Sequence, residues 1–338
     1  MSHSLSRMAF LAAALLLSGQ AVAQDKIRIT SSNDSLLYNP IYAAEAMGYF
    51  KQNGLDVERL HSTSGPNAIA ALLAGDIEMV MGVPSSPMLA RKAGGDIKMI
   101  AGVASQYGVN VAITQKWADA HNVKADSTYQ QRLAALKGIT IGVTGPGGGN
   151  DQLVSYLAEQ AGLDRSRDMN VVALGDGSAL LAAFSQGTVD AISISTPHSN
   201  VAPVTFGGLL LFNTGIGDVE PLRGFFGAAV SARGEWLEKN PDVARRFVKS
   251  LQMGLDAMHD PARTEEVKVA IWKLVFSKLD QSLFTQIWHD TIIGTPTTTL
   301  ITDKMLEDLI DFGNRFSKNK LDNSIVKESY TNEYAPAA

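Results

Sequence analysis

Small hydroxyl residues and glycines stand where the sequence pattern predicts that helices begin. They are Ser64-Gly65, Ser85-Ser86 and the run from Thr144 through Gly148 to Asp151. The first N–H groups of a helix have no partner within it, so these positions favour a bound anion. The glycines at 147–149 would also let backbone amides approach a ligand closely. The run lacks the Gly-Lys-Ser/Thr ending of a phosphate-binding P-loop. The alternative is that these residues only cap helices and form turns.

Further candidates lie near the ends of other predicted strands. Asn33 and Tyr38 follow the first strand, His198 follows Ser195-Thr196-Pro197, and Arg223 precedes a later strand. Arg223 could pair with an anion through its planar guanidinium, or simply be solvated. His198 could be a neutral hydrogen-bonding group or a structural histidine. Aromatic side chains could cover the apolar part of a ligand or belong to the core; these are Tyr38, Tyr42, Tyr107, Phe225 and Phe226.

No motif in the sequence predicts catalysis. The chain has no Gly-x-Ser-x-Gly elbow, no His-Glu-x-x-His pair and no acidic cluster with the spacing of metal ligands. We therefore predict no catalytic residue, no metal and no cofactor, and we expect a binding protein.

The amino terminus has the pattern of a secretory signal peptide. Arg7 precedes an apolar run at 8–17, and Ala21-Val22-Ala23 offers a small-residue cleavage site. We predict that residues 1–23 are the signal peptide. No later stretch approaches the ~18 apolar residues of a membrane span. The chain has no cysteine for a lipid anchor, so we expect a periplasmic protein of a Gram-negative bacterium.

Length and charge narrow the class of protein. A mature chain of this length favours two domains. The net charge of −5 and the absence of a helix-turn-helix or base-stacking pattern make nucleic acid an unexpected partner. A regulator with an effector lobe would need a DNA-binding helix pair and would have no signal peptide.

Short apolar strands alternate with segments of helical period, which is typical of an α/β protein. We predict strands at 26–30, 54–58, 77–81, 97–103, 109–114, 139–143, 169–173, 189–194, 209–212 and 225–230, and helices at 40–50, 67–74, 86–92, 151–161 and 178–186. The alternation begins afresh at Val109, so we predict lobe I at 24–106 plus 225–338 and lobe II at 107–224. Residues 235–320 have helical period, and we expect the tail at 329–338 to be loosely held.

One internal similarity supports two lobes of similar build. The segments at 68–80 and 179–191 share an apolar helix, a glycine and a direct turn into a strand. Any helix-to-strand unit could produce the same pattern, which remains the alternative.

These features resemble a known family, the periplasmic substrate-binding proteins of the sulfonate, taurine, nitrate and thiamine-precursor group of ABC importers. The resemblance covers nearly the whole mature chain. It rests on the segments 43–58, 64–65, 71–77, 82–87, 136–142, 187–191 and 235–241. It implies a two-lobed periplasmic-binding-protein (type II) fold, in which two crossing strands join the lobes and a ligand lies in the cleft between them.

The resemblance also implies a function and a site. It implies a small-molecule ligand, a transporter in the membrane as partner and a monomeric carrier. It places ligand contacts on Ser64, Gly65, Ser85 and Ser86, and further on Asn33, Thr144 and Gly148. Helix-start loops with few basic residues favour an organic anion of the sulfonate type, while an aromatic carboxylate or a pyrimidine remains open. The thiamine-pyrimidine synthase of this fold depends on cysteines, which this chain lacks.

Overall fold

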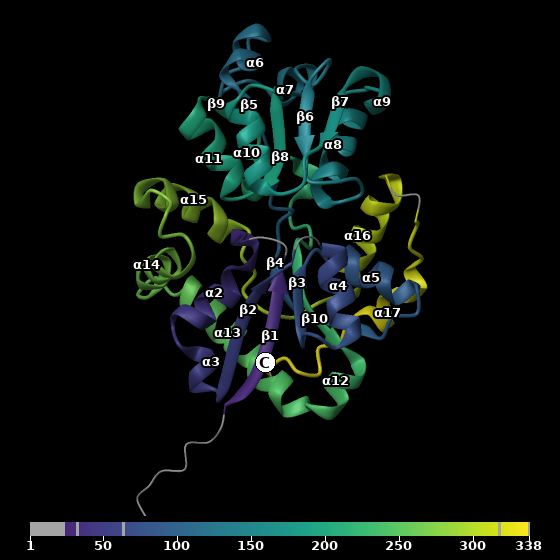
Figure 1. Ribbon diagram of the computed structural model, residues 1–338, viewed down its shortest axis with the longest axis vertical. Helices are drawn as coiled ribbons and strands as arrows, with labels where there is room; N and C mark the ends of the chain where they lie inside the picture. The colour runs from purple at the N-terminus through teal and green to yellow at the C-terminus, as the bar shows by residue number, and fades with distance from the viewer. Residues whose placement is uncertain (1–23, 32–33, 63–64, 317–318, 337–338) are drawn as a thin grey trace, which may run out of the picture.

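The computed structural model describes residues 24–31, 34–62, 65–316 and 319–336. Two five-stranded mixed sheets form two lobes, one above the other in Figure 1. The first lobe has the strand order β2-β1-β3-β10-β4, and the second has β7-β6-β8-β5-β9. The strands are β1 Asp25–Ser31, β2 Leu55–His61, β3 Met79–Gly82, β4 Ile97–Ala104, β5 Val109–Thr114, β6 Thr140–Val143, β7 Asn170–Ala173, β8 Ala191–Ser195, β9 Gly208–Phe212 and β10 Ala228–Arg233.

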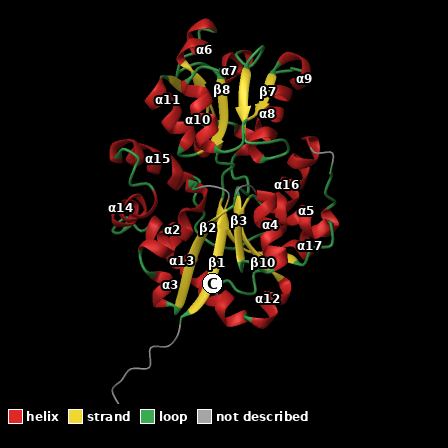
Figure 2. Cartoon of the chain, in the orientation of Figure 1, coloured by secondary structure: helices red, strands yellow, loops and turns green. Residues whose placement is uncertain are grey.

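Helices lie on either side of each sheet (Figure 2). Those of the first lobe are α2 Asn39–Ala46, α3 Tyr49–Gln52, α4 Gly65–Ala74, α5 Ser85–Lys92, α12 Gly234–Lys239, α13 Pro241–His259, α14 Thr264–Val275, α15 Gln281–Ile293, α16 Asp303–Phe316 and α17 Val326–Ser329. Those of the second lobe are α6 Gln115–Ala120, α7 Tyr129–Ala134, α8 Gly149–Gln160, α9 Arg165–Asp168, α10 Gly177–Ser185 and α11 His198–Phe206. Four short 3₁₀ turns complete the described chain, namely η2 Leu36–Tyr38, η3 Thr214–Ile216, η4 Glu220–Leu222 and η5 Asn323–Ile325.

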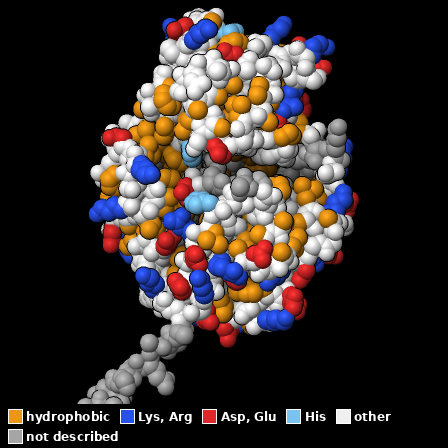
Figure 3. All heavy atoms as spheres, in the orientation of Figure 1, with side chains coloured by type: hydrophobic (Ala, Val, Ile, Leu, Met, Phe, Trp, Pro, Cys, Tyr) orange, Lys and Arg blue, Asp and Glu red, His pale blue; other side chains and the backbone are white. Residues whose placement is uncertain are grey.

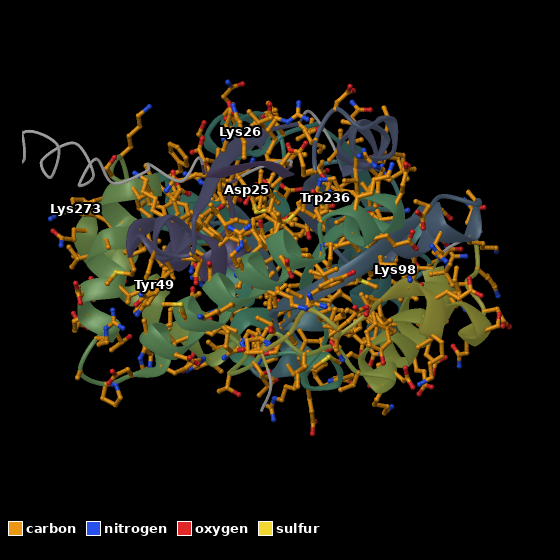
Figure 4. The ribbon with its side chains drawn as sticks, turned by 90° about the horizontal axis from the view of Figure 1, so that it is seen from below. Asp25, Lys26, Tyr49, Lys98, Trp236 and Lys273 are labelled. Atoms are coloured by element: carbon orange, nitrogen blue, oxygen red, sulfur yellow. The ribbon has the colours of Figure 1, made fainter. Side chains whose placement is uncertain are left out.

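The central strands are apolar because both faces of each sheet are covered. In β1, Ile27 and Ile29 are fully buried, and the strand pairs in parallel with β2 and β3. Figure 4, which views the molecule from below, shows Asp25 and Lys26 at the start of this strand. There the Asp25 carboxylate accepts a 2.5 Å hydrogen bond from Arg246 of α13. The N-terminal end of the sheet is thus tied to a helix that covers it.

The internal similarity corresponds to two equivalent units. Gly75 follows α4 with φ +89°, and Gly187 follows α10 with φ +67°. A left-handed residue ends a helix at low cost only where there is no Cβ. The chain then turns into β3 in the first lobe and β8 in the second. The prediction of two lobes with equivalent helix-to-strand units is confirmed.

Two segments connect the lobes. The chain leaves the first sheet after Ala104, enters the second at Val109, and returns between Phe212 and Ala228. The predicted domain boundaries, at 106/107 and 224/225, fall within these segments and stay proposals. The predicted strand at 225–230 exists with different bounds, because β10 pairs from Ala228 to Arg233. A Cβ on Gly227 would lie 1.9 Å from the carbonyl oxygen of Gln106. The two connecting segments therefore pass too close to each other at this point for a residue with a side chain.

Other differences have local causes. The predicted helix at 40–50 is divided into α2 and α3, because Gly48 adopts φ +75°. The helix α11 was not predicted; it contains Pro203, which usually argues against a helix interior. The predicted signal peptide lies outside the described residues. No helix among the described residues combines the length and apolar character needed to cross a membrane.

The tail is held, and the expectation that it is loose is wrong for its described part. The N–H of Thr331 donates to the carbonyl of Met99, and Asn332 exchanges two hydrogen bonds with the backbone of Ile301. Tyr334 is buried in the core of the first lobe. Backbone pairing and one aromatic anchor therefore dock a segment whose composition indicates only a polar terminus.

Candidate ligand-binding site between the lobes

A pocket that opens to solvent lies where the two lobes meet. Figure 3 shows the surface hollowed at this level of the molecule. We call it the inter-lobe cavity, and its walls come from the β3–α5 loop, both connecting segments, the start of α8 and helix α16. The lining residues are Val83, Pro84, Ser85, Tyr107, Val109, Gly149, Gln152, Phe225, Phe226, Gly227, Leu309 and Gly313. All of these side chains are uncharged.

The first lobe contributes the beginning of α5. This helix follows Pro84, which provides no side-chain cap. The N–H of Ser86 donates to the carbonyl of Val83 and Pro87 has no N–H, so the first turn leaves the N–H of Ser85 for a ligand. The hydroxyl groups of Ser85 and Ser86 are half-buried, and neither forms a hydrogen bond with another described residue. Gly65 begins the neighbouring helix α4, and a Cβ placed on it would lie 4.0 Å from the Ser86 hydroxyl. The structure thus brings together Gly65, Ser85 and Ser86, while Ser64 lies outside the described residues.

The second lobe contributes the beginning of α8. Gly148 precedes this helix in an extended conformation and provides no side-chain cap. The amide of Asn150 donates 2.9 Å and 3.1 Å hydrogen bonds to the Thr144 hydroxyl and the Ser193 carbonyl. A Cβ on Gly149 would lie 3.9 Å from Val83 of the first lobe. Thr144 and Gly148 therefore lie together at the start of α8. The Asn150 side chain, held by Thr144, also accepts a 3.0 Å hydrogen bond from the N–H of Asp151 in the first turn of the helix.

Aromatic side chains of the connecting segments form one wall. The hydroxyl of Tyr107 donates a 2.5 Å hydrogen bond to the carbonyl of Gly149, which joins a connecting segment to α8. Burial raises the pKa of this hydroxyl, so it remains a donor. The ring of Phe225 lies 5.1 Å from that of Tyr107, and Phe226 is almost fully buried. This wall suits the apolar part of an organic ligand.

His198 lies beside another helix start in the second lobe. Its imidazole lies 3.1 Å from the position of a Cβ on Gly177, the first residue of α10. Its Nδ1 is buried and has no hydrogen-bond partner. Burial lowers the pKa of His198, and the carboxylates of Asp34 and Asp176 only partly oppose this shift. The imidazole is therefore neutral at pH 7. Because the carboxylate of Asp176 caps α10, this helix end is already occupied.

Three other predicted residues have different surroundings. Tyr38 is packed in the core of the first lobe, and burial raises its pKa to about 12. Tyr42 is fully buried against Phe276, so both tyrosines take the core role that the sequence left open. Arg223 is exposed, and its Nε donates a 2.6 Å hydrogen bond to the carbonyl of Gly217 in the same segment. Asn33 lies outside the described residues.

Sequence reasoning missed a polar contact between the lobes. The hydroxyl of Ser35 donates to the Thr196 carbonyl at 3.2 Å, and the N–H of Leu36 donates to the same oxygen at 3.1 Å. Ser35 also caps η2 by accepting from the N–H of Leu37. A serine before two leucines is a signal for a helix cap. The sequence could not indicate that a carbonyl of the other lobe completes the cap.

Among the described residues, no three histidine, aspartate or glutamate side chains lie together in a group that could hold a metal ion. The inter-lobe cavity offers backbone N–H groups, the hydroxyl of Ser85 and aromatic surface. These groups can bind a ligand but do not combine a nucleophile with its base.

Comparisons with known proteins agree with this fold. "Putative binding protein YtlA" of Bacillus subtilis (strain 168) is 24% identical over 249 residues, covering 72% of this chain and 69% of that protein. The alkanesulfonate-binding protein SsuA from Xanthomonas axonopodis pv. citri, solved with MOPS, matches with a TM-score of 0.68 at 18% identity, over 91% of this chain and 98% of that one. The periplasmic nitrate-binding protein NrtA from Synechocystis PCC 6803 matches with a TM-score of 0.66 at 15% identity. The match covers 93% of this chain and 87% of that one.

The two structural matches confirm the predicted two-lobed periplasmic-binding-protein fold. All three proteins are named as binding proteins, which supports the prediction of a binding protein over an enzyme. Residues 33–271 match the model of the NMT1-like family, and the chain belongs to that family.

Proposed function

We propose that this protein is the solute-binding component of an ABC-type importer. In this role the chain is exported to the periplasm of a Gram-negative bacterium, binds its solute as a monomer and delivers it to the membrane subunits of the transporter. Support comes from the family, from the two-lobed fold and from the names of the relatives, which include sulfonate-binding and nitrate-binding proteins of the periplasm.

The proposed ligand is a small organic anion of the sulfonate type. The observation that carries this choice is that α5 and α8 both begin at the inter-lobe cavity, and neither is capped by the residue that precedes it; in α8 the Asn150 side chain accepts from the N–H of Asp151 and leaves the N–H of Gly149 for a ligand. Such ends present N–H groups and a partial positive charge to an anion. No lysine or arginine lines the cavity, so binding would depend on backbone dipoles and hydroxyls. The apolar wall favours an anion that carries carbon over a bare oxoanion.

An aromatic carboxylate is the second candidate. It is favoured by the rings of Tyr107 and Phe225, whose centroids lie 5.1 Å apart beside the start of α8. A flat ring could pack against this pair while its carboxylate meets the helix end. A pyrimidine would use the same wall but would bring no anion to the helix ends.

A thermal-shift screen of residues 24–338 tests the proposal. The probes are butanesulfonate, taurine, nitrate, phenylacetate and a pyrimidine. A ligand at about 100 times its dissociation constant adds about 2.7 kcal/mol to folding stability. We expect the largest shift with butanesulfonate. If only the pyrimidine shifts the melting temperature, the anion proposal is wrong and the carrier role stands; if no probe shifts it and no solute co-purifies, the carrier role itself fails.

Two glycines of one loop provide a matched pair of variants. An alanine at Gly149 would contact Tyr107 and Val83 at ordinary distances of 3.7 Å and 3.9 Å, so the fold should persist. Its methyl group would nevertheless occupy the start of α8, where the ligand is proposed to lie. An alanine at Gly145 would meet nothing within 4 Å. We expect Gly149→Ala to weaken butanesulfonate binding at least tenfold and Gly145→Ala to leave it unchanged.

A further inference from the structure

A second pocket lies on the other side of the connecting segment between β4 and β5. Tyr107 of this segment lines the inter-lobe cavity, whereas its neighbours Gln106 and Gly108 line a separate pocket. Walls of this hinge pocket come from both lobes and from α15, and they include Leu36, Thr196, Asn213 and Asp290. A ligand in it would contact both lobes at the point where they join.

The hinge pocket contains an unsatisfied buried acceptor. Gln106 is only 8% exposed, and its Oε1 has no hydrogen-bond partner among the described residues. A Cβ on Gly294 would lie 2.6 Å from the Gln106 Cγ, so the absence of a side chain at 294 leaves space for this glutamine. A buried carbonyl oxygen without a donor lowers the stability of the folded protein. A ligand that brings an N–H donor would remove this cost.

The same pocket contains a carboxylate without a cationic partner. Asp290 of α15 accepts a 3.1 Å hydrogen bond from the amide of Asn213, and it forms no ion pair with any described residue. The lining includes no lysine, arginine or histidine. The remaining surface is in part apolar, because Leu36, Leu37 and Ile287 also line the pocket. The pocket therefore combines the Gln106 Oε1 and the negatively charged Asp290 carboxylate with an apolar wall.

We propose that the hinge pocket binds a small organic cation, a primary ammonium that carries an apolar group. The ammonium donates to the Asp290 carboxylate, which has no cationic partner, and to the Gln106 Oε1, which has no hydrogen-bond donor. The apolar group packs against the leucines. This site is distinct from the anion site proposed above, since the ligand charge is opposite and the pocket lies across the connecting segment.

Titration of the purified protein with n-butylammonium, followed by calorimetry or ligand-observed NMR, tests the proposal. We expect one site per chain and at least tenfold weaker binding of n-butanol, which has the same apolar group without the charge. Asp290→Asn keeps an acceptor for Asn213 but removes the charge, and should weaken butylammonium binding at least tenfold. Asp280→Asn removes a carboxylate from the same helix while keeping a good helix cap, and should bind as the unchanged protein does.

A second variant tests the role of the glutamine. Gln106→Met keeps the length of the side chain and removes the unpartnered oxygen. It should leave the melting temperature unchanged or raise it, while butylammonium binding weakens. The proposal is overturned if butylammonium does not bind, if Asp290→Asn binds it equally well, or if Gln106→Met lowers the melting temperature without affecting binding. Gly149→Ala should leave this binding unchanged, so failure here is separable from failure of the proposed carrier role.

Discussion

The ring of Phe312, on α16 of the first lobe, lies 5.4 Å from the ring of Tyr156, on α8 of the second lobe. Phe312 is 8% exposed and belongs to the hydrophobic core of the second lobe. It also lies 5.5 Å from Tyr107, and Arg315 of the same helix pairs with Glu159 of α8. Helix α16 therefore attaches one flank of the first lobe to the second lobe.

Phe312→Ala should destabilise the whole protein. Removing a buried phenylalanine loses apolar burial and leaves a cavity, which together cost about 3–5 kcal/mol. Urea denaturation would measure the loss of unfolding free energy. Phe206→Ala is the matched control, because Phe206 of α11 is 47% exposed and its replacement should cost less than about 0.5 kcal/mol. Equal effects of the two variants would show that α16 does not pack on the second lobe as described.

Asn332→Ala should also lower stability, because the tail is docked through this side chain. The amide of Asn332 accepts a hydrogen bond from the N–H of Ile301 at 3.0 Å and donates one to its carbonyl at 2.7 Å. The substitution leaves both backbone groups without these partners, at a cost of about 1–3 kcal/mol. Glu333→Ala provides the control, since the pair between Glu333 and Arg245 is exposed and worth little. A midpoint in urea that Asn332→Ala does not change would contradict docking of the tail.

The sequence was sufficient to predict most strands and the two-lobed fold. The alternation of Ile27 and Ile29 with charged residues and the short apolar run around Ile141 both favour strands, and the helix-to-strand units at Gly75 and Gly187 contain left-handed turns. The pattern of residues within one helix or strand does not indicate which distant segments of the chain that element packs against. The pattern of α16 predicts that Phe312 is buried but not that it is buried in the other lobe.

The candidate site could likewise be predicted only where local sequence determines the structure. Hydroxyl and glycine residues at helix starts predicted where Gly65, Ser86 and Gly148 would lie, because capping chemistry is local. The core positions of Tyr38 and Tyr42 could not be told from ligand contacts, since an aromatic residue suits both environments. The hinge pocket depends on Gln106, Asn213 and Asp290, which lie in separate segments that only the tertiary structure assembles.

Acid should destabilise the protein partly through His198. Burial lowers the pKa of His198 below its ordinary value of 6.5. As the pH falls through that ordinary value, the unfolded chain binds a proton that the folded protein does not, so the free energy of unfolding decreases. The decrease is complete once the pH is below the pKa of the folded protein. His198→Gln should therefore reduce the loss of stability between pH 7.5 and pH 5.5.

Urea denaturation at these two pH values would measure the effect of His198. The control is His121→Gln, at an exposed histidine of the second lobe, which should keep the original pH dependence. The carboxylates of Asp34 and Asp176 act against the effect of burial, so removing either should increase the acid sensitivity. If His198→Gln lost as much stability in acid as the unchanged protein, burial of a neutral imidazole would not be the cause.

Ligand binding should close the lobes by movement about the two connecting segments. Outside these segments the lobes also meet through the Phe312 cluster of α16 and through the hydrogen bond between Asp290 of α15 and Asn213. A ligand that contacts both α5 and α8 favours the closed state, because only that state offers both helix ends at once.

Because the chain has no cysteine, spin labels can be attached only at introduced cysteines. Lys116→Cys in α6 and Lys239→Cys in α12 place labels on exposed positions of different lobes. Saturating butanesulfonate should narrow the distribution of distances between these labels and shift it to a new mean. A pair at Lys116 and Lys137, both in the second lobe, should give the same distribution with and without ligand. If the inter-lobe distribution also stayed the same while calorimetry showed full occupancy, the lobes would bind ligand without closing.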